Sequence, residues 1–263
     1  MPHPLRVRDK AEIRRRLNAD REWSLYALAD LDDGLFAQCE WWAVEGGLAL
    51  VFRGIAIRPI FVMGDAASVR ALLQALPEPS GYLNLSAHHV DAAAGIYDYR
   101  KRHDMRRMIL EDFRPRPGAV EPLGPEHCGE IERLYASGEG GGVAFAPFQL
   151  LTGLFRGIRR DGCLVAVAGV QAASPQEGVA AIGNIFTHPD FRGHGLAQAA
   201  TSAVVAAVRA AGIRTIGLNV ESRNAAAIHA YERIGFRTRF PYFEGVADKR
   251  ITSEPEPAAE PPK

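Results

Sequence analysis

The sequence predicts an α/β protein built from two lobes that repeat one order of helices and strands. Three observations support this prediction. Short apolar runs typical of strands alternate with helical periodicity throughout, the two halves follow the same element order, and a segment with three prolines at 114–124 lies between them. We therefore expect a first lobe over 1–113, a linker over 114–124 and a second lobe over 125–251.

The first half is expected to form two helices, three strands, a helix, a strand, a helix and a strand. In chain order these are predicted over 9–17, 21–31, 35–43, 48–52, 59–63, 66–76, 82–86, 90–100 and 106–111. The signal is weaker here than in the second half, but the order is the same. We infer a degenerate repeat of one architecture.

The second half is expected to begin with two helices and to continue with three strands, a helix, a strand and a helix. In order these are predicted over 126–137, 147–158, 163–167, 169–173, 179–187, 196–211, 216–220 and 224–234. Pro147 opens the second helix, as helix geometry permits, and Gly235 stops the last one. The tail at 252–263 is rich in Pro, Glu and Ala and is expected to be disordered.

The segment 190–197, Asp-Phe-Arg-Gly-His-Gly-Leu-Ala, is the most informative in the chain. It opens a predicted helix, whose first N–H groups lack partners and whose end carries partial positive charge. Gly193 and Gly195 have no Cβ atoms, so a phosphate can approach the backbone closely. Arg192 adds a permanent cation. The segment therefore predicts a diphosphate-binding turn.

A dinucleotide-binding loop is the first alternative, because Glu221 stands near the position of a ribose-binding acid. However, Gln198 replaces the third glycine of that fingerprint, and five residues separate the strand from the glycines. A Walker-type phosphate loop is excluded, because no Gly-Lys-Ser/Thr follows. The dinucleotide interpretation remains the weaker one.

A second motif lies on the helix predicted at 224–234, where Asn224, Ile228 and Tyr231 share one face ahead of Gly235-Phe236. Together the motifs resemble the GNAT superfamily of acyl-CoA-dependent N-acyltransferases. Its Arg/Gln-x-x-Gly-x-Gly/Ala motif appears at 192–197, and its Asn-x-x-Ala-x-x-x-Tyr motif at 224–231. The resemblance covers roughly 123–246 and implies two tandem GNAT-like lobes, each a mixed, mostly antiparallel sheet flanked by helices.

The resemblance implies direct transfer of an acetyl group from acetyl-CoA to a primary amine. The pantetheine arm is then expected along the edge of the strand at 179–187, and Tyr231 is the expected general acid. The residues expected to bind acetyl-CoA are Ile185, Phe186, Thr187, Arg192, Gly193, His194, Gly195, Leu196, Ala197, Asn219, Asn224 and Tyr231. The alternative function is an acyl-CoA-binding sensor or scaffold without turnover.

Several assignments stay open at this point. The general base is among His188, Glu221, Glu139 and His194, or is replaced by a water chain or by an amine that arrives neutral. Asn224 fits either a helix N-cap or a contact with CoA. Small amines, polyamines, amino acids and protein N-termini or lysines all fit as acceptors, and the oligomeric state is undetermined.

The first half lacks the diphosphate motif, and Asp65 caps its central helix where a phosphate would need a cation. We therefore expect one CoA per chain. We also expect the first lobe to dock on the second and to wall one side of the acceptor cleft. The large apolar residues that support this docking are Trp23, Phe36, Trp41 and Trp42.

Composition adds broad limits. The 31 basic and 31 acidic residues balance, which gives no electrostatic reason to expect nucleic acid or an anionic membrane as a partner. The basic clusters at 14–16, 100–102, 106–107 and 159–160 are interpreted as solvated faces. Three scattered cysteines without metal-ligand spacing favour reduced thiols, no metal and a cytoplasmic location. No secretory signal or membrane-spanning segment is evident.

Overall fold

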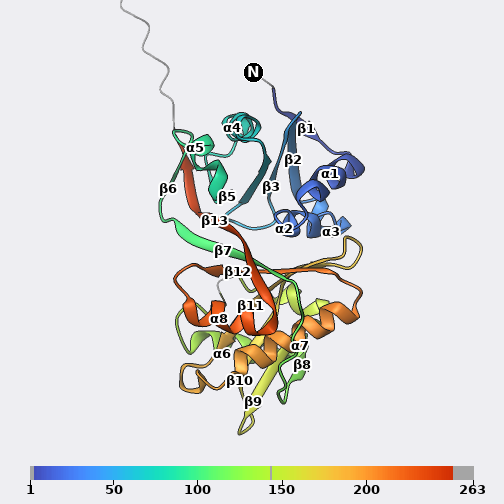
Figure 1. Ribbon diagram of the computed structural model, residues 1–263, viewed down its shortest axis with the longest axis vertical. Coiled ribbons are helices and arrows are strands. Elements are labelled where there is room, and N and C mark those ends of the chain that lie inside the picture. Colours follow the sequence, from blue (N-terminus) through green and yellow to red (C-terminus); the bar gives the residue numbers. More distant parts are fainter. Residues whose placement is uncertain (1–2, 143, 251–263) are drawn as a thin grey trace, which may run out of the picture.

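A computed structural model describes residues 3–142 and 144–250, and in it the two halves share one 13-stranded sheet (Figure 1). Most neighbouring strands are antiparallel, and helices cover both faces, as the sequence predicts for the fold class. None of the helices in the described part of the chain has the length and apolarity needed to cross a membrane. The expectation of a disordered tail at 252–263 lies outside the described residues.

The first half contains seven strands and five α-helices, with bounds close to the predicted ones in its central part. In chain order they are β1 (Leu5–Val7), α1 (Lys10–Leu17), α2 (Leu25–Ala29), α3 (Asp33–Phe36), β2 (Cys39–Val44), β3 (Gly47–Phe52), β4 (Pro59–Gly64), α4 (Ala66–Ala75), β5 (Ser80–Ser86), α5 (Val90–Ala93), β6 (Tyr97–Tyr99) and β7 (His103–Leu110).

The described part of the second half contains six strands and three α-helices. In chain order they are β8 (Glu121–Leu123), α6 (Cys128–Ala136), β9 (Phe155–Arg160), β10 (Cys163–Ser174), β11 (Val179–Thr187), α7 (Leu196–Ala210), β12 (Thr215–Glu221), α8 (Ala225–Ile234) and β13 (Phe236–Lys249). Short 3₁₀ helices join several of these elements, among them Pro147–Thr152 ahead of β9.

The two halves exchange strands at the centre of the sheet. The strand order is β1-β2-β3-β4-β5-β13-β7-β12-β11-β10-β9-β8, with β6 paired to β13 outside this path. Strand β7 therefore leaves its own half to pair with β12, while the long β13 reaches back to pair with β5. Figure 1 shows β7 and β13 running side by side between the two lobes.

Because of this exchange, the expected boundary at 114–124 does not separate two independent sheets. A cut there divides the sequence, but it does not divide the sheet, because each half supplies a strand that lies inside the other lobe. The segment also contains β8, so it is not wholly a linker. The lobes are further joined by an ion pair between Arg14 on α1 and the buried Glu177, which follows β10, at 2.7 Å.

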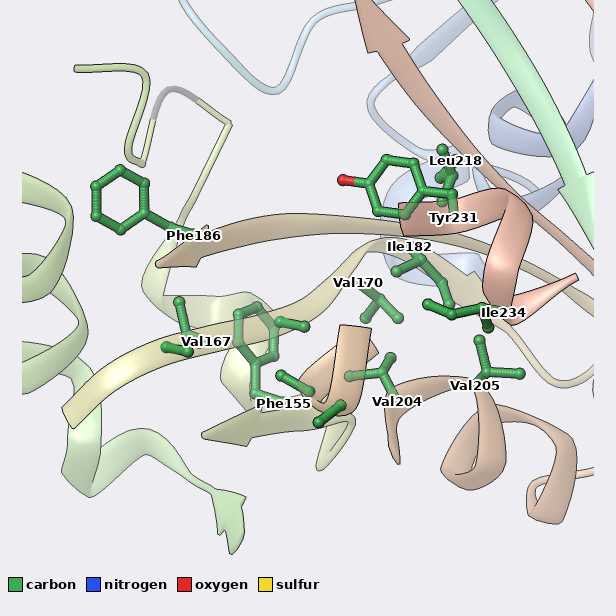
Figure 2. Packing of buried hydrophobic residues seen from close by; sticks show 14 of the residues in the cluster. Phe155, Val167, Val170, Ile182, Phe186, Val204, Val205, Leu218, Tyr231 and Ile234 are labelled. Carbon is green, nitrogen blue, oxygen red and sulfur yellow. The ribbon is translucent and has the colours of Figure 1, made fainter. Parts of the chain in front are cut away.

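Three hydrophobic cores stabilise the sheet. The core of the second lobe lies between β9–β12 and the helices α6, α7 and α8, and Figure 2 shows part of it. A second core packs α4 and α5 against β2–β5. The third, under α1 and α2, contains residues of both lobes, including Trp23, Tyr242 and Val179. Burial of these apolar surfaces fixes the first lobe against the second.

Several predicted elements are wrong in detail. The helix expected at 147–158 is a 3₁₀ turn that Gly153 ends with a left-handed φ of 68°, after which β9 pairs with β10. Gly95 likewise stops the helix expected at 90–100, and the residues after it form β6. The helix expected at 21–31 is confined to Leu25–Ala29. The two strands expected at 163–173 are one strand, β10, with bulges.

Candidate active site

The candidate site lies where β11 and β12 separate. These parallel strands pair from Val179 opposite Thr215 to Ile182 opposite Leu218, and their pairing ends there. Beyond Ile182, β11 continues to Thr187 and pairs only with β10 among the described residues. One edge of β11 is therefore available to a ligand.

A β-bulge causes this separation. Between two paired positions, Phe186 with Val167 and Gly183 with Gly169, β11 holds one more residue than β10. Asn184 takes the left-handed conformation there, with φ of 53°, which is uncommon for a residue other than glycine. Its side-chain amide donates to Val170 O at 3.2 Å, which holds the bulge in place.

A pocket of about 190 Å³ opens at this separation. Its lining comes from β10, β11, β12, α6, α8 and the glycine-rich segment after α6. The described lining residues are Tyr135, Gly140, Gly142, Ala144, Gln171, Ile182, Gly183, Asn184, Ile185, Asn219 and Tyr231, and none of them is charged. Three of the predicted site residues, Ile185, Asn219 and Tyr231, thus meet at one pocket.

Tyr231 is buried except at the pocket. Its ring packs edge-on against Phe236 with centroids 6.3 Å apart, and only 8% of the residue is exposed. Figure 2 shows its hydroxyl pointing out of the cluster of apolar side chains. Burial raises the pKa of Tyr231 to about 12, so the phenol keeps its proton at neutral pH. It can therefore donate a proton, as an acid must.

The N-terminus of α7 provides a second, open feature of the site. Gly195 caps the helix with a φ of 75°, and no side chain of residues 3–142 or 144–250 bonds the free amides of the first turn. Gly193 has a φ of 82°. A Cβ added at either glycine would meet no protein atom within 4 Å, so the space above both is open to a ligand. These observations fit a phosphate group.

The other residues predicted around this turn contribute in different ways. Arg192 is exposed, and its Nε donates to Thr187 O at 3.2 Å, which holds the guanidinium beside the end of β11. Thr187 Oγ1 is buried without a partner among the described residues. His194 is exposed. Side chains of Phe186 and Leu196 are in the core, which leaves only their backbone groups for a ligand. Ala197 lies in the first turn of α7.

Asn224 acts as a helix cap, one of the two roles the sequence allows. Its Oδ1 accepts from Ala227 N at 3.1 Å at the start of α8. It is not among the described residues that line the pocket. Contact between Asn224 and CoA therefore stays a prediction.

Arg107 was expected on a solvated basic face, and this expectation is wrong. The residue is 3% exposed and lies on the exchanged strand β7. Its Nε donates to Asn219 Oδ1 at 3.1 Å, and another guanidinium nitrogen donates to Trp23 O. Its guanidinium also lies over the rings of Trp23 and Tyr26, at 4.7 and 5.2 Å from their centroids. The charge pattern of the sequence could not indicate that aromatic rings bury Arg107.

A second residue of the first lobe reaches the pocket wall. The hydroxyl of Tyr26 on α2 donates to Gln171 Oε1 at 2.6 Å. Burial raises the pKa of Tyr26 well above its ordinary value, so this hydroxyl stays protonated. The first lobe thus touches the pocket through Tyr26 and Arg107, each of which holds a lining side chain.

The candidate bases lie away from the pocket lining. Glu221 pairs with Arg223 at 2.6 Å and with His103 at 3.0 Å, and the hydrogen bond from Arg223 is the main cause that lowers the pKa of its carboxyl. His188 accepts from Asp190 N in the turn after β11, and Glu139 and His194 are exposed. None of these four lines the pocket among the described residues.

The matching position in the first lobe is filled by protein. Strand β4, the counterpart of β11, ends its parallel pairing with β5 at Phe61. Beyond it, Trp23 Nε1 donates to Val62 O at 3.1 Å, and His89 donates to Gly64 O at 2.9 Å. Asp65 caps α4 by accepting from Ser68 N at 2.8 Å. These contacts occupy backbone groups of β4 and α4 whose counterparts on β11 and at the start of α7 are open.

Sequence reasoning missed five polar side chains of the site. Asn184 and Gln171 stand as polar residues inside apolar strands, and this pattern could have marked them. Tyr135, whose hydroxyl donates to Asn184 O at 2.9 Å, carries no such signal. Tyr26 and Arg107 reach the pocket only through the lobe contact and the strand exchange, so no local pattern identifies them.

Comparison with known proteins agrees with this geometry. The model of the acetyltransferase (GNAT) family matches residues 144–236. The ribosomal protein bS18-alanine N-acetyltransferase of Escherichia coli K12 is 29% identical over 130 residues, which span 47% of this chain and 79% of that enzyme.

Solved structures show the same fold over both lobes. A GNAT-family protein of Novosphingobium aromaticivorans, described as a putative acetyltransferase, has a TM-score of 0.62 at 21% identity and covers 88% of this chain and 100% of its own. A tandem GNAT protein from the clavulanic acid biosynthesis pathway has a TM-score of 0.59 at 13% identity and covers 97% and 100%. The second half of this chain therefore contains a GNAT-family domain over residues 144–236.

Proposed function

We propose that the chain transfers an acetyl group from acetyl-CoA directly to a primary amine. The observation that carries this proposal is the position of the Tyr231 hydroxyl at the pocket where β11 and β12 separate. A protonated phenol at that point can serve a leaving thiolate, and a pure binding site has no need of one. We propose 125–251, completed by the exchanged β7, as the transferase lobe.

Acetyl-CoA fits the open features of the site. The amides at 193–197 and Arg192 would hold its diphosphate, because the helix end is positively polarised and the space above both glycines is free. The unpaired edge of β11 near Ile185, Phe186 and Thr187 would hold its pantetheine arm. Asn224 and Tyr231 complete the proposed contact set, and Asn219 lies beside them on the pocket wall.

The chemistry requires no covalent intermediate on the protein. The amine nitrogen attacks the thioester carbonyl carbon, the new C–N bond forms and the C–S bond breaks. The sulfur takes the proton of the Tyr231 hydroxyl, the proton lost by the amine passes to water, and water returns a proton to the Tyr231 oxygen before the next turnover. A backbone N–H on the open edge of β11 would stabilise the developing oxyanion. Water is the proposed proton acceptor because the described lining residues include no carboxylate or imidazole.

We propose a primary amine as the acceptor. The relative from Escherichia coli is named for acetylating an alanine of a ribosomal protein. We propose a cytoplasmic location, where acetyl-CoA is made, with no nucleic-acid or membrane partner. The balanced charge of the chain gives no electrostatic attraction for nucleic acid or an anionic membrane.

The experiment is to incubate the protein with acetyl-CoA and a panel of amines and to measure free thiol together with the acetylated product. We expect thiol release that depends on an amine and matches the product in amount. Tight CoA binding without thiol release for any amine would instead support the alternative, a sensor or scaffold that binds acyl-CoA. Binding of NADH without binding of CoA would revive the dinucleotide interpretation.

A further inference from the structure

The first lobe fixes the direction of a side-chain amide at the pocket. Arg107 contacts Asn219, and a guanidinium carries only hydrogen-bond donors. The oxygen of the Asn219 amide therefore faces Arg107. Its Nδ2, with two donor hydrogens, is left for a ligand in the pocket that Asn219 lines.

The amide of Gln171 also turns its oxygen toward the first lobe. The Tyr26 hydroxyl donates to Oε1 of Gln171 at 2.6 Å, so Nε2 of this lining residue is the group left for the pocket. Tyr26 and Arg107 come from the first lobe, on α2 and β7. Two side-chain amides of the transferase lobe thus present N–H donors to the pocket, because residues of the first lobe bind their oxygens.

The guanidinium of Arg107, which lies behind the Asn219 amide, carries a positive charge that would attract an anionic ligand. Arg107 is 3% exposed, and its polar contacts in the described part of the chain are to two neutral oxygens, Asn219 Oδ1 and Trp23 O. Aromatic rings of Trp23, Tyr26 and Tyr242 surround the guanidinium. Glu244 on β13 accepts from the Tyr242 hydroxyl at 2.7 Å and forms no ion pair with the guanidinium. Because no carboxylate among the described residues pairs with Arg107, its charge leaves a positive potential at Asn219. No charged residue among those described in the pocket lining opposes it.

We propose that the acceptor is an α-amino acid whose carboxylate binds the amide N–H groups of Asn219 and Gln171. Donors and positive potential on that side select an anion, and the adjacent amine then faces the thioester beside Tyr231. Polyamines bring further cations and lysine side chains carry no carboxylate beside the amine, so both are disfavoured. This inference rests on the proposed acetyl transfer and names the substrate class of that reaction.

The first test compares acceptors that differ only in the group beside the amine. Alanine, alaninamide and isopropylamine carry a carboxylate, a neutral amide and a methyl group there, and spermidine carries further cations. Equivalent acid and amide pairs with serine and phenylalanine side chains remove the dependence on one side chain. We expect kcat/KM for the acids to exceed that for the amides at least about tenfold, the scale of one charged hydrogen bond. The simple amine and spermidine should be poorer still.

The second test uses isosteric changes. In Asn219→Asp and in Gln171→Glu one oxygen keeps its contact with the first lobe, and the other replaces an N–H at the pocket. Each change should lower kcat/KM for amino acids at least about tenfold and remove the preference for acid over amide. Asn18→Asp is the matched control, because Asn18 Oδ1 also accepts from an arginine, Arg21 at 2.6 Å, outside the pocket. It should keep the preference.

The possible outcomes test the acceptor proposal and the acetyl transfer separately. Thiol release with amides or polyamines at rates equal to or above those of the amino acids would overturn the acceptor proposal and leave acetyl transfer standing. Equal losses for every acceptor, together with weaker CoA binding in Asn219→Asp, would place Asn219 on CoA and overturn it as well. Absence of thiol release with every amine would refute the acetyl transfer itself.

Discussion

Arg107 Nε donates to Asn219 Oδ1 at 3.1 Å across the paired strands β7 and β12. The first residue belongs to the first half of the sequence, and the second lines the pocket of the transferase lobe. Because of the strand exchange, a residue of the first half thus contacts a residue that lines the pocket. The first lobe completes the transferase lobe in addition to packing beside it.

The exchange predicts that the two halves stay together without a covalent link. A protease site inserted within 117–119, where the chain is exposed, would allow cleavage of the folded protein. Because β7 and β13 each lie inside the other lobe, we expect the cleaved halves to elute together in gel filtration and to retain thiol release. A fragment starting at Val120 should lack a cooperative melting transition, because β12 and β13 lose the strand between them. Separation of the cleaved halves into two folded species would contradict this view.

Gly195→Val should weaken CoA binding sharply. The valine Cβ would project above the first turn of α7, where the diphosphate is proposed to lie, and a φ of 75° is strained for a β-branched residue. Gly162→Val is the matched control, since Gly162 has a φ of 80°, has equally open surroundings and lies in the turn between β9 and β10. Calorimetry should show a loss of affinity in the first variant only. Equal affinity in both would remove the diphosphate from this turn.

One CoA should bind per chain. In the first lobe the indole of Trp23 and the imidazole of His89 occupy the carbonyls that follow the paired part of β4, and Asp65 places a carboxylate at the start of α4. Hydrogen bonding from the backbone N–H of Ser68 lowers the pKa of Asp65, which keeps this carboxylate negative where a phosphate would need a cation. Titration calorimetry should saturate at one equivalent, and saturation at two would refute the degenerate character of this lobe.

The sequence predicted the local parts of this structure better than the long-range ones. The strand at 179–187, the helix that follows the glycines and the cap at Asn224 are encoded by neighbouring residues, so their patterns are readable. The strand exchange depends on which of two similar edges each strand joins, and no local pattern records that choice. For the same reason Arg107 looked like part of a solvated basic cluster, although aromatic residues from distant segments bury it.

The pKa of Tyr231 predicts the pH dependence of turnover. Burial raises this pKa to about 12, and an acid with a raised pKa remains protonated at every pH below that value. We therefore expect no loss of kcat from Tyr231 between about pH 7 and about pH 10, while a free amine would lose its proton and react faster. A fall in kcat centred near pH 9 that disappears in Tyr231→Phe would show that burial has not raised the pKa of this phenol.

The most direct measurement is the comparison of turnover and CoA affinity in Tyr231→Phe. We expect kcat to fall about 100- to 10,000-fold, the usual contribution of a general acid, with CoA affinity nearly unchanged because only the hydroxyl is removed. Tyr97→Phe is the control, since Tyr97 is also a buried tyrosine and its hydroxyl donates to Glu78 O in the first lobe. It should retain full turnover. Wild-type turnover in Tyr231→Phe would contradict the account and leave Tyr231 as a packing residue.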